Sequence, residues 1–261
     1  IRNALRYQLS NLYDFDPAKN TVPTAQLTWL DRWILGEYTK LETDVLAAYD
    51  KSEFHVVYQK VSQFVSVELS SIYHDVIKDR CYTDPANSLR RRSTQTALYR
   101  LVTGLSQLLS PILAYTADEA WELIPGKPTS SVHESVYQLV ALNPAAEDAA
   151  KWAWLKQWRE TLLPELEKAR KAKTIGKALE AKADLVLPAD QQTHADAELL
   201  RELVNVSRLN LTTGATATFS VSKADGQKCE RCWHFETDLG QDPSHPNLCP
   251  RCVEAVKTFK V

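Results

Sequence analysis

Four cysteines near the carboxyl end constrain this chain more tightly than any other feature. They form two C-x2-C pairs separated by sixteen residues, and they are Cys229, Cys232, Cys249 and Cys252. Two residues between cysteines let a tight turn point both sulfurs at one ion, and two such turns complete the tetrahedron that zinc prefers. Because four thiolates fill every coordination position, the pattern predicts one structural zinc rather than a catalytic one. The short segment has little core of its own, so we expect the metal to supply its folding free energy.

Other uses of C-x2-C pairs fit this segment less well. Rubredoxin-type iron sites usually have Gly after the second cysteine of a pair, where this chain has Trp233 and Val253. Redox disulfides rarely occur as two pairs at zinc-ribbon spacing. His234 and His245 lie within the segment and could replace a thiolate, but with four cysteines present we expect surface or RNA-facing imidazoles. For Cys81, far from the cluster, we expect a packed thiol.

Composition excludes several classes of protein. The chain of 261 residues is 44% hydrophobic and 25% charged, which is typical of a globular protein with an ordinary core. Its net charge of −2 gives no overall basic field, so a polyanion site would have to be a local patch. No apolar run approaches the roughly 20 residues that span a bilayer, and the first residues do not have the charged-then-apolar pattern of a signal peptide. The cysteine usage suits a reducing compartment, and we expect a cytoplasmic protein.

Two further features of the composition concern the extent of the chain. It begins at Ile1, inside an amphipathic pattern, and it contains no methionine. We therefore expect a piece of a longer protein.

Helical periodicity dominates the first 124 residues. Apolar side chains recur every three or four residues, and Pro or Asp-Pro breaks separate the periodic segments. The expected helices cover approximately residues 1–12, 24–45, 53–76, 86–110 and 111–124. Long helices joined by short breaks predict an antiparallel bundle.

The pattern changes after the bundle. A connector rich in Pro, Ser and Thr covers residues 126–143, with a short extended piece at 132–137. A further long helix follows at 145–173, and Pro164 should kink or divide it. A small α+β unit is then predicted from strands at 183–187, 207–211 and 217–221 and a helix at 195–204. The predicted division is a helical bundle (1–142), a helix with the α+β unit (143–222) and a zinc module (223–261).

Cations gather in two stretches. Residues 78–100 hold six Lys or Arg against two Asp, and residues 165–182 hold six against three Glu. Arg91 and Arg92 in the first stretch, and Arg170 and Lys173 in the second, are candidate phosphate ligands. The alternative is a solvated helix surface whose charges pair with one another.

The zinc module carries no such excess. Residues 223–261 hold six Lys or Arg and six Asp or Glu, so RNA binding there would rest on stacking and hydrogen bonds. Trp233 and Phe235 flank His234 directly after the second cysteine. Unpaired loop bases stack on aromatic faces of this kind. The alternative is that Trp233 packs against the zinc core.

These motifs together resemble one known family. The terminal GQKCERCWHF and LCPRC segments resemble the zinc module of bacterial isoleucyl-tRNA synthetases, which is related to that of formamidopyrimidine-DNA glycosylase. Further segments resemble, in order, the anticodon-binding helical domain of these class I enzymes: RNALRY at 2–7, LDRW at 30–33, KDR at 78–80, RRS at 91–93, PIL at 111–113, TADE at 116–119, SVH at 131–133 and LEA at 179–181. Ala178 departs from the Ser that usually precedes the last of these.

The resemblance implies a function in protein biosynthesis. It implies an antiparallel anticodon-binding bundle, then a small α+β unit and a four-cysteine zinc module, which recognise the anticodon stem-loop of isoleucine tRNA. Trp233, His234, Arg91, Arg92, Arg170 and Lys173 are the expected tRNA contacts. The parent would be a monomeric, ATP-dependent isoleucine–tRNA ligase. HIGH- and KMSKS-type motifs and the editing domain are absent from these residues, so we expect binding of tRNA without its aminoacylation.

Two other functions stay open. A non-enzymatic nucleic-acid-binding protein could reuse the same bundle and zinc finger, also on DNA. A protein-docking module would use the zinc and the helices as scaffold only.

Overall fold

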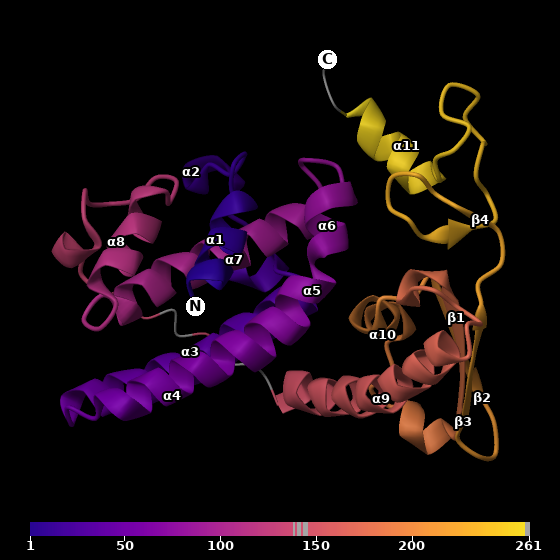
Figure 1. Cartoon of the computed structure of the whole chain (residues 1–261), viewed down its shortest axis with the longest axis horizontal. Helices are drawn as coiled ribbons and strands as arrows, with labels where there is room; N and C mark the ends of the chain where they lie inside the picture. Colours follow the sequence, from indigo (N-terminus) through magenta and orange to yellow (C-terminus); the bar gives the residue numbers. More distant parts are fainter. Residues whose placement is uncertain (138, 140–141, 143–145, 259–261) are drawn as a thin grey trace. The chain divides into compact units, whose positions relative to one another are not determined.

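The computed structural model describes residues 1–137, 139, 142 and 146–258 (Figure 1). It divides into two compact units, unit 1 (residues 1–144) and unit 2 (residues 145–261). The described part of unit 1 is helical, whereas unit 2 combines helices with two small sheets. This mainly α architecture with a small α+β part confirms the predicted fold class. Among the described residues, no helix is both long and apolar enough to cross a membrane.

Helices joined by short breaks form unit 1, as the periodicity predicts. Its α-helices are α1 (Arg2–Ser10), α2 (Pro17–Asn20), α3 (Trp29–Asp50), α4 (Phe54–Phe64), α5 (His74–Val76), α6 (Lys78–Thr83), α7 (Leu89–Leu109) and α8 (Ala114–Glu122). Helices α3 and α4 lie side by side, and α7 contacts α1, α3, α6 and α8 (Figure 1). Leu98, Leu101 and Leu105 of α7 are buried, so α7 supplies the centre of the core.

A buried carboxylate ties α3 to its neighbours. Asp31, in the first turn of α3, is fully buried and accepts hydrogen bonds from Tyr73 Oη (2.6 Å) and Ser93 Oγ (2.5 Å). Its Oδ2 lies 3.5 Å from the guanidinium of Arg80, which is also buried. A buried charge is tolerated only when it is paired and hydrogen-bonded. This network therefore fixes α3, α6 and α7 against one another.

The helix predicted over 53–76 is not α-helical throughout. A π-helix, Val65–Tyr73, separates α4 from α5. Ser71 Oγ donates to the carbonyl of Ser66 within this wider turn (2.6 Å). The wider turn also brings Tyr73 to Asp31, a tertiary contact that helical periodicity does not reveal.

The connector after α8 is wrongly predicted as extended at 132–137. Val132–Glu134 forms a 3-10 turn instead. Asp118 of α8 causes this turn, because its Oδ1 accepts from Ser131 Oγ (2.7 Å) and from the Val132 amide (2.9 Å). These bonds fold the connector back onto α8.

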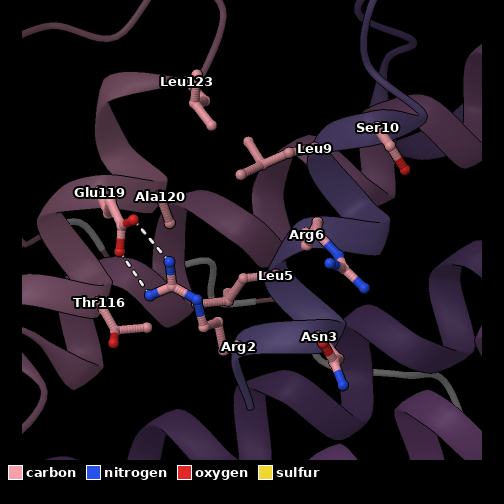
Figure 2. Close-up of a pocket in the computed structure, with 10 residues that line it drawn as sticks. All are labelled: Arg2, Asn3, Leu5, Arg6, Leu9, Ser10, Thr116, Glu119, Ala120 and Leu123. Carbon is pink, nitrogen blue, oxygen red and sulfur yellow. Dashed lines mark hydrogen bonds and ion pairs between the residues drawn. The ribbon is translucent and has the colours of Figure 1, made fainter.

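Helices α1 and α8 border a groove of about 430 Å³ (Figure 2). Apolar side chains from both helices point into it, including Leu5, Leu9 and Leu123. A bidentate ion pair between Arg2 and Glu119 crosses one side of the groove, with nitrogen–oxygen distances of 2.5 and 2.6 Å. The pair is solvent-exposed, so it contributes little to stability.

Unit 2 begins with the long helix α9 (Ala146–Lys171). The elements that follow are β1 (Ala181–Leu187), α10 (Ala197–Val204), β2 (Arg208–Thr213), β3 (Thr218–Lys223), β4 (Gln227–Lys228), β5 (Phe235–Glu236) and α11 (Pro250–Lys257). Strand β1 is central, parallel to β2 and antiparallel to β3, with Ala183 opposite Leu209 and Val221. Alternate residues of β1 are buried, and α9 and α10 contact this sheet.

Of the two outcomes predicted for Pro164, a kink or a division of the helix, the division does not occur. The helix continues through Pro164 to Lys171. Leu155, Leu162 and Leu166 on this helix are buried, so its apolar face has a packing partner on both sides of the proline. A proline costs about 3 kcal/mol inside a helix, and this packing opposes that cost.

Asp31→Ala should destabilise unit 1 strongly. The substitution leaves the guanidinium of Arg80 buried without its carboxylate, which costs about 3–5 kcal/mol of unfolding free energy. Urea unfolding followed by circular dichroism measures this loss. Asp44→Ala, on the same helix, removes an exposed pair with Lys60 and should cost less than about 1 kcal/mol. Equal losses for the two variants would contradict the role given to Asp31.

Candidate metal centre and nucleic-acid interface

The first cysteine pair lies at the end of a short hairpin. Strands β4 and β5 pair antiparallel, and the chain turns back between them through Cys229 and Cys232. The Cys229 amide donates to the His234 carbonyl (2.8 Å), and the Trp233 amide donates to the Cys229 carbonyl (3.0 Å). Gly226 precedes the hairpin with φ +90°, and a Cβ there would lie 2.2 Å from the Glu236 carbonyl oxygen. The hairpin therefore requires glycine at this position.

The second pair lies at the start of α11. Cys249 is the N-cap residue of this helix, Pro250 occupies the first turn, and Cys252 follows on the helix. The Cys249 amide donates to the sulfur of Cys229 at 3.4 Å. A hydrogen bond of this kind stabilises a thiolate, because the donor faces its negative charge.

The four sulfurs fit a tetrahedral metal site. They lie within 4.8 Å of one another, all four cysteines are buried, and none forms a disulfide. Hydrogen bonds from Cys249 and Cys252 hold the pKa of the Cys232 thiol well below its ordinary value, against the effect of burial. Hydrogen bonds to Cys232 and Cys252, with burial, raise the pKa of Cys249. The Cys232 thiolate thus disfavours ionisation of Cys249 beside it, so several thiolates together need a cation.

The hairpin is attached to the α/β part of unit 2 by its two residues after Trp233. His234 is buried, and its Nδ1 lies 3.5 Å from the guanidinium of Arg201 on α10. The Phe235 amide donates to Ser207 Oγ at 2.7 Å. The prediction that His234 contacts RNA does not fit this burial. The imidazole instead fixes the hairpin to α10.

Trp233 has the opposite environment. Its side chain is 53% exposed, and its backbone has φ +67°, in the left-handed region that bulky residues rarely adopt. The ammonium groups of Lys177 and Lys228 lie 5.7 and 5.3 Å from its ring centroid. Cations at these distances are attracted to the ring face. The tight turn between the cysteines thus presents an open indole between two positive charges, rather than a ring packed on the metal centre.

The second cation stretch adjoins this tryptophan through Lys177. Lys171 and Lys173 are exposed at the carboxyl end of α9, and Arg170 there forms an exposed pair with Glu167. Lys173 has φ +59°, and the Thr174 amide donates to the Ala169 carbonyl (3.0 Å), which closes the helix end as a Schellman turn. Glycine usually occupies that position. The chain here keeps a cation instead.

The arginines of the first cation stretch form ion pairs and hydrogen bonds within unit 1. Arg91 is 3% exposed, and its guanidinium binds both carboxylate oxygens of Asp14, at 2.7 and 2.9 Å. The side chain of Arg92 is also largely covered and bonds to the Asp14 carbonyl. Arg90 pairs with Asp79 at 2.9 Å. The prediction that Arg91 and Arg92 bind phosphate does not fit these contacts, because the guanidiniums already neutralise carboxylates of the fold.

Comparison with known proteins identifies the family. A model described as the anticodon-binding domain of tRNA ligase matches residues 31–185, more than half of the chain. The chain belongs to this family. A second model, the zinc finger found in FPG and IleRS, matches residues 226–255. With the four-cysteine cluster, it confirms one structural zinc.

Isoleucine–tRNA ligases are similar to this anticodon-binding chain along nearly its whole length. The enzyme of Methylacidiphilum infernorum is 43% identical over 260 residues, and that of Dichelobacter nodosus is 41% identical over 260 residues. Each comparison covers 98% of this chain and 28% of the relative. The enzyme of Desulfitobacterium hafniense (strain DSM 10664 / DCB-2) is 40% identical over 282 residues, covering 98% of this chain and 30% of the relative. The chain thus spans less than a third of the length of the relatives it matches.

The sequence pattern missed four residues at this interface of the anticodon-binding chain. Lys177 and Lys228 bracket the Trp233 ring, whereas Arg201 and Ser207 hold the residues that follow it. Lys177 lies within the second cation stretch, so its charge could have marked it as a candidate phosphate ligand. Lys228 directly precedes Cys229, so its charge was equally visible, whereas Arg201 and Ser207 come from other parts of unit 2 and only the fold brings them to the hairpin.

Removal of zinc should unfold the cysteine-containing end of the chain and spare unit 1. Its four buried thiols repel one another once ionised without a cation, whereas unit 1 holds its own apolar core. Hydrogen exchange measured by mass spectrometry, with and without a chelator, compares residues 227–257 with α3 and α7. Loss of protection in both regions would contradict the modular role of the metal.

A matched pair of cysteine variants tests the ligand set. Cys229→Ser should bind less than one zinc per chain, whereas Cys81→Ser, which removes the buried thiol of unit 1, should keep the full complement. Metal analysis of the two purified proteins measures this directly.

Proposed function

We propose that the chain recognises the anticodon stem-loop of isoleucine tRNA, as the carboxyl-terminal part of an isoleucine–tRNA ligase. The observation that carries this proposal is the exposed indole of Trp233 between Lys177 and Lys228. Anticodon loops offer unpaired bases, and stacking on an aromatic ring contributes about 1–3 kcal/mol per base. The family of the chain and the names of its relatives support the choice of tRNA over other polyanions.

Each part of the interface has a distinct role in this proposal. Cys229, Cys232, Cys249 and Cys252 hold the structural zinc, which closes the hairpin. Trp233 stacks on one unpaired base, and Lys177 and Lys228 bind the phosphates beside it. Arg170, Lys171 and Lys173 extend the positive surface along the end of α9. The left-handed backbone conformation of Lys173 and Trp233 lowers the stability of the fold, and residues in such conformations cluster at functional sites.

The reaction, the oligomeric state and the compartment that we propose are those expected for the complete ligase. The ligase forms the ester between isoleucine and tRNA with ATP, and the present residues contribute tRNA binding. The chain acts as a monomer in the cytoplasm. Light scattering of the purified chain at micromolar concentration tests the monomer.

Binding of an isoleucine tRNA transcript by the chain tests the function. We expect preference over an unrelated tRNA and over duplex DNA, and an affinity that falls steeply with salt because phosphate binding releases counterions. Fluorescence anisotropy at several salt concentrations measures both. Equal affinity for unrelated tRNA would contradict anticodon recognition, and stronger binding of duplex DNA would favour the alternative of a DNA-binding protein.

Trp233 and the lysines should have separable effects. Trp233→Ala, which keeps a side chain on the left-handed backbone, should lower affinity about tenfold without changing the salt dependence. Lys177→Ala with Lys228→Ala should reduce the salt slope by about 1–2, since each phosphate contact contributes about 0.7–0.9. Lys51→Ala, an exposed lysine of unit 1, is the matched control and should leave the slope unchanged. Full affinity in both interface variants would favour the alternative of a protein-docking scaffold.

A further inference from the structure

Both cysteine pairs of the zinc module have an arginine at the same position. Arg231 directly precedes Cys232, and Arg251 directly precedes Cys252, so each pair has the sequence Cys-x-Arg-Cys. The two arginines are half-buried, and the cysteines beside them are buried. A guanidinium is always charged, so one that lies beside buried sulfurs needs a negative partner there.

The guanidiniums cross between the two pairs. Arg231 belongs to the first pair, yet its Nη1 donates to the sulfur of Cys252 at 3.8 Å. The side chain of Arg251, from the second pair, donates to the sulfur of Cys232. Each arginine therefore binds the cysteine that follows the other arginine. This reciprocal arrangement joins the hairpin to the start of α11 through charged groups.

Backbone amides also bond to the sulfurs, but they act differently. The Cys249 amide donates to the sulfur of Cys229 at 3.4 Å. The His234 amide donates to the sulfur of Cys232, and the Cys252 amide donates to the sulfur of Cys249. An amide turns a dipole toward a thiolate and brings no net charge, whereas a guanidinium brings a full positive charge.

The charge of the occupied centre explains why that difference matters. Four thiolates and one zinc ion together carry a net charge of about −2, and two guanidiniums bring the sum to about zero. Residues 223–261 hold six Lys or Arg and six Asp or Glu, so the module has no general excess of cations to screen the centre. The positions of Arg231 and Arg251 supply the compensation locally.

We propose that Arg231 and Arg251 form an outer layer of the zinc centre, in which they neutralise its net negative charge and thereby retain the metal. Partners that bond to metal ligands in this way typically change metal affinity by about 10–100-fold when they are removed. The proposal concerns the structural zinc and does not depend on RNA binding, so it can fail while the proposed function stands.

Competition for zinc between the complete chain and a chromophoric chelator tests the proposal. Arg231→Gln and Arg251→Gln each remove one positive charge from the sulfurs, and each should raise the zinc Kd about 10–100-fold. The double variant should raise it further, because the centre then keeps its full negative charge.

Lys257→Gln is the matched control. It removes a positive charge from the same module, but the ammonium of Lys257 pairs with Asp242 (2.6 Å) rather than with a sulfur. Its pair is largely exposed, so the zinc Kd should stay within about twofold of the value for the unchanged chain. Arginine variants whose zinc Kd matches this control would overturn the proposal.

Substitution by lysine separates charge from shape. Arg231→Lys and Arg251→Lys keep the positive charge and lose the planar fork of the guanidinium. Because neutralisation needs only the charge, we expect the zinc Kd of each to rise by no more than about threefold, less than in the glutamine variants. Equal losses for lysine and glutamine would overturn the neutralising role.

Cobalt(II) in place of zinc gives a readout that a loss of packing would not imitate. A tetrahedral cobalt–thiolate site has visible bands that report its geometry and a near-ultraviolet band from sulfur-to-metal charge transfer. Removing a positive charge beside a sulfur makes this transfer easier. The near-ultraviolet band should therefore move to longer wavelength in Arg231→Gln and Arg251→Gln, while the visible bands persist. An unmoved band together with weaker binding would show a purely structural role for the arginines and overturn the proposal.

Discussion

Repulsion among four buried thiolates is the constraint on which the carboxyl-terminal part of the structure depends. The sulfurs of Cys229, Cys232, Cys249 and Cys252 lie within 4.8 Å of one another, closer than unscreened negative charges can remain. A zinc ion turns this repulsion into attraction and closes a hairpin that has few apolar contacts of its own. The hairpin in turn places Trp233 in left-handed backbone, pointing outward. The metal therefore shapes the surface that we propose for RNA, although its four ligands are themselves buried.

Helical periodicity and cysteine spacing predicted much of this structure because both are local signals. The bundle helices, the strands of unit 2 and the cysteine cluster all follow from residues close in sequence. The π-helix at Val65–Tyr73 does not, and neither does the tertiary bond from Tyr73 to Asp31 that accompanies it. The continuity of α9 through Pro164 is likewise decided by packing. In each case a distant partner outweighs the local preference.

Charge counts alone could not separate the two cation stretches. Both carry a formal excess, yet in unit 1 the arginines pair with carboxylates that lie elsewhere in the sequence, such as Asp14 and Asp31. At the carboxyl end of α9 the pairs of Lys168 and Arg170 are local, and Lys171, Lys173 and Lys177 face solvent. An exposed cation loses little free energy when it exchanges a carboxylate partner for a phosphate. A buried cation would have to break a well-formed ion pair first, which costs much more. Burial, rather than net charge, therefore distinguishes the stretch whose cations remain available for the proposed RNA contact.

The division of labour between charge and stacking follows from the same physics. Phosphate contacts provide affinity for any RNA, and this affinity falls as the salt concentration rises. Stacking requires unpaired bases, so it favours loops over duplexes, and it depends little on salt. In unit 2 the proposed site offers both kinds of contact, a ring at Trp233 and cations at Lys177 and Lys228. In unit 1 the guanidiniums of Arg90 and Arg91 already pair with Asp79 and Asp14. An arginine that appears in the sequence to be a phosphate ligand can thus serve the fold instead, because binding a phosphate would leave its carboxylate without a charged partner.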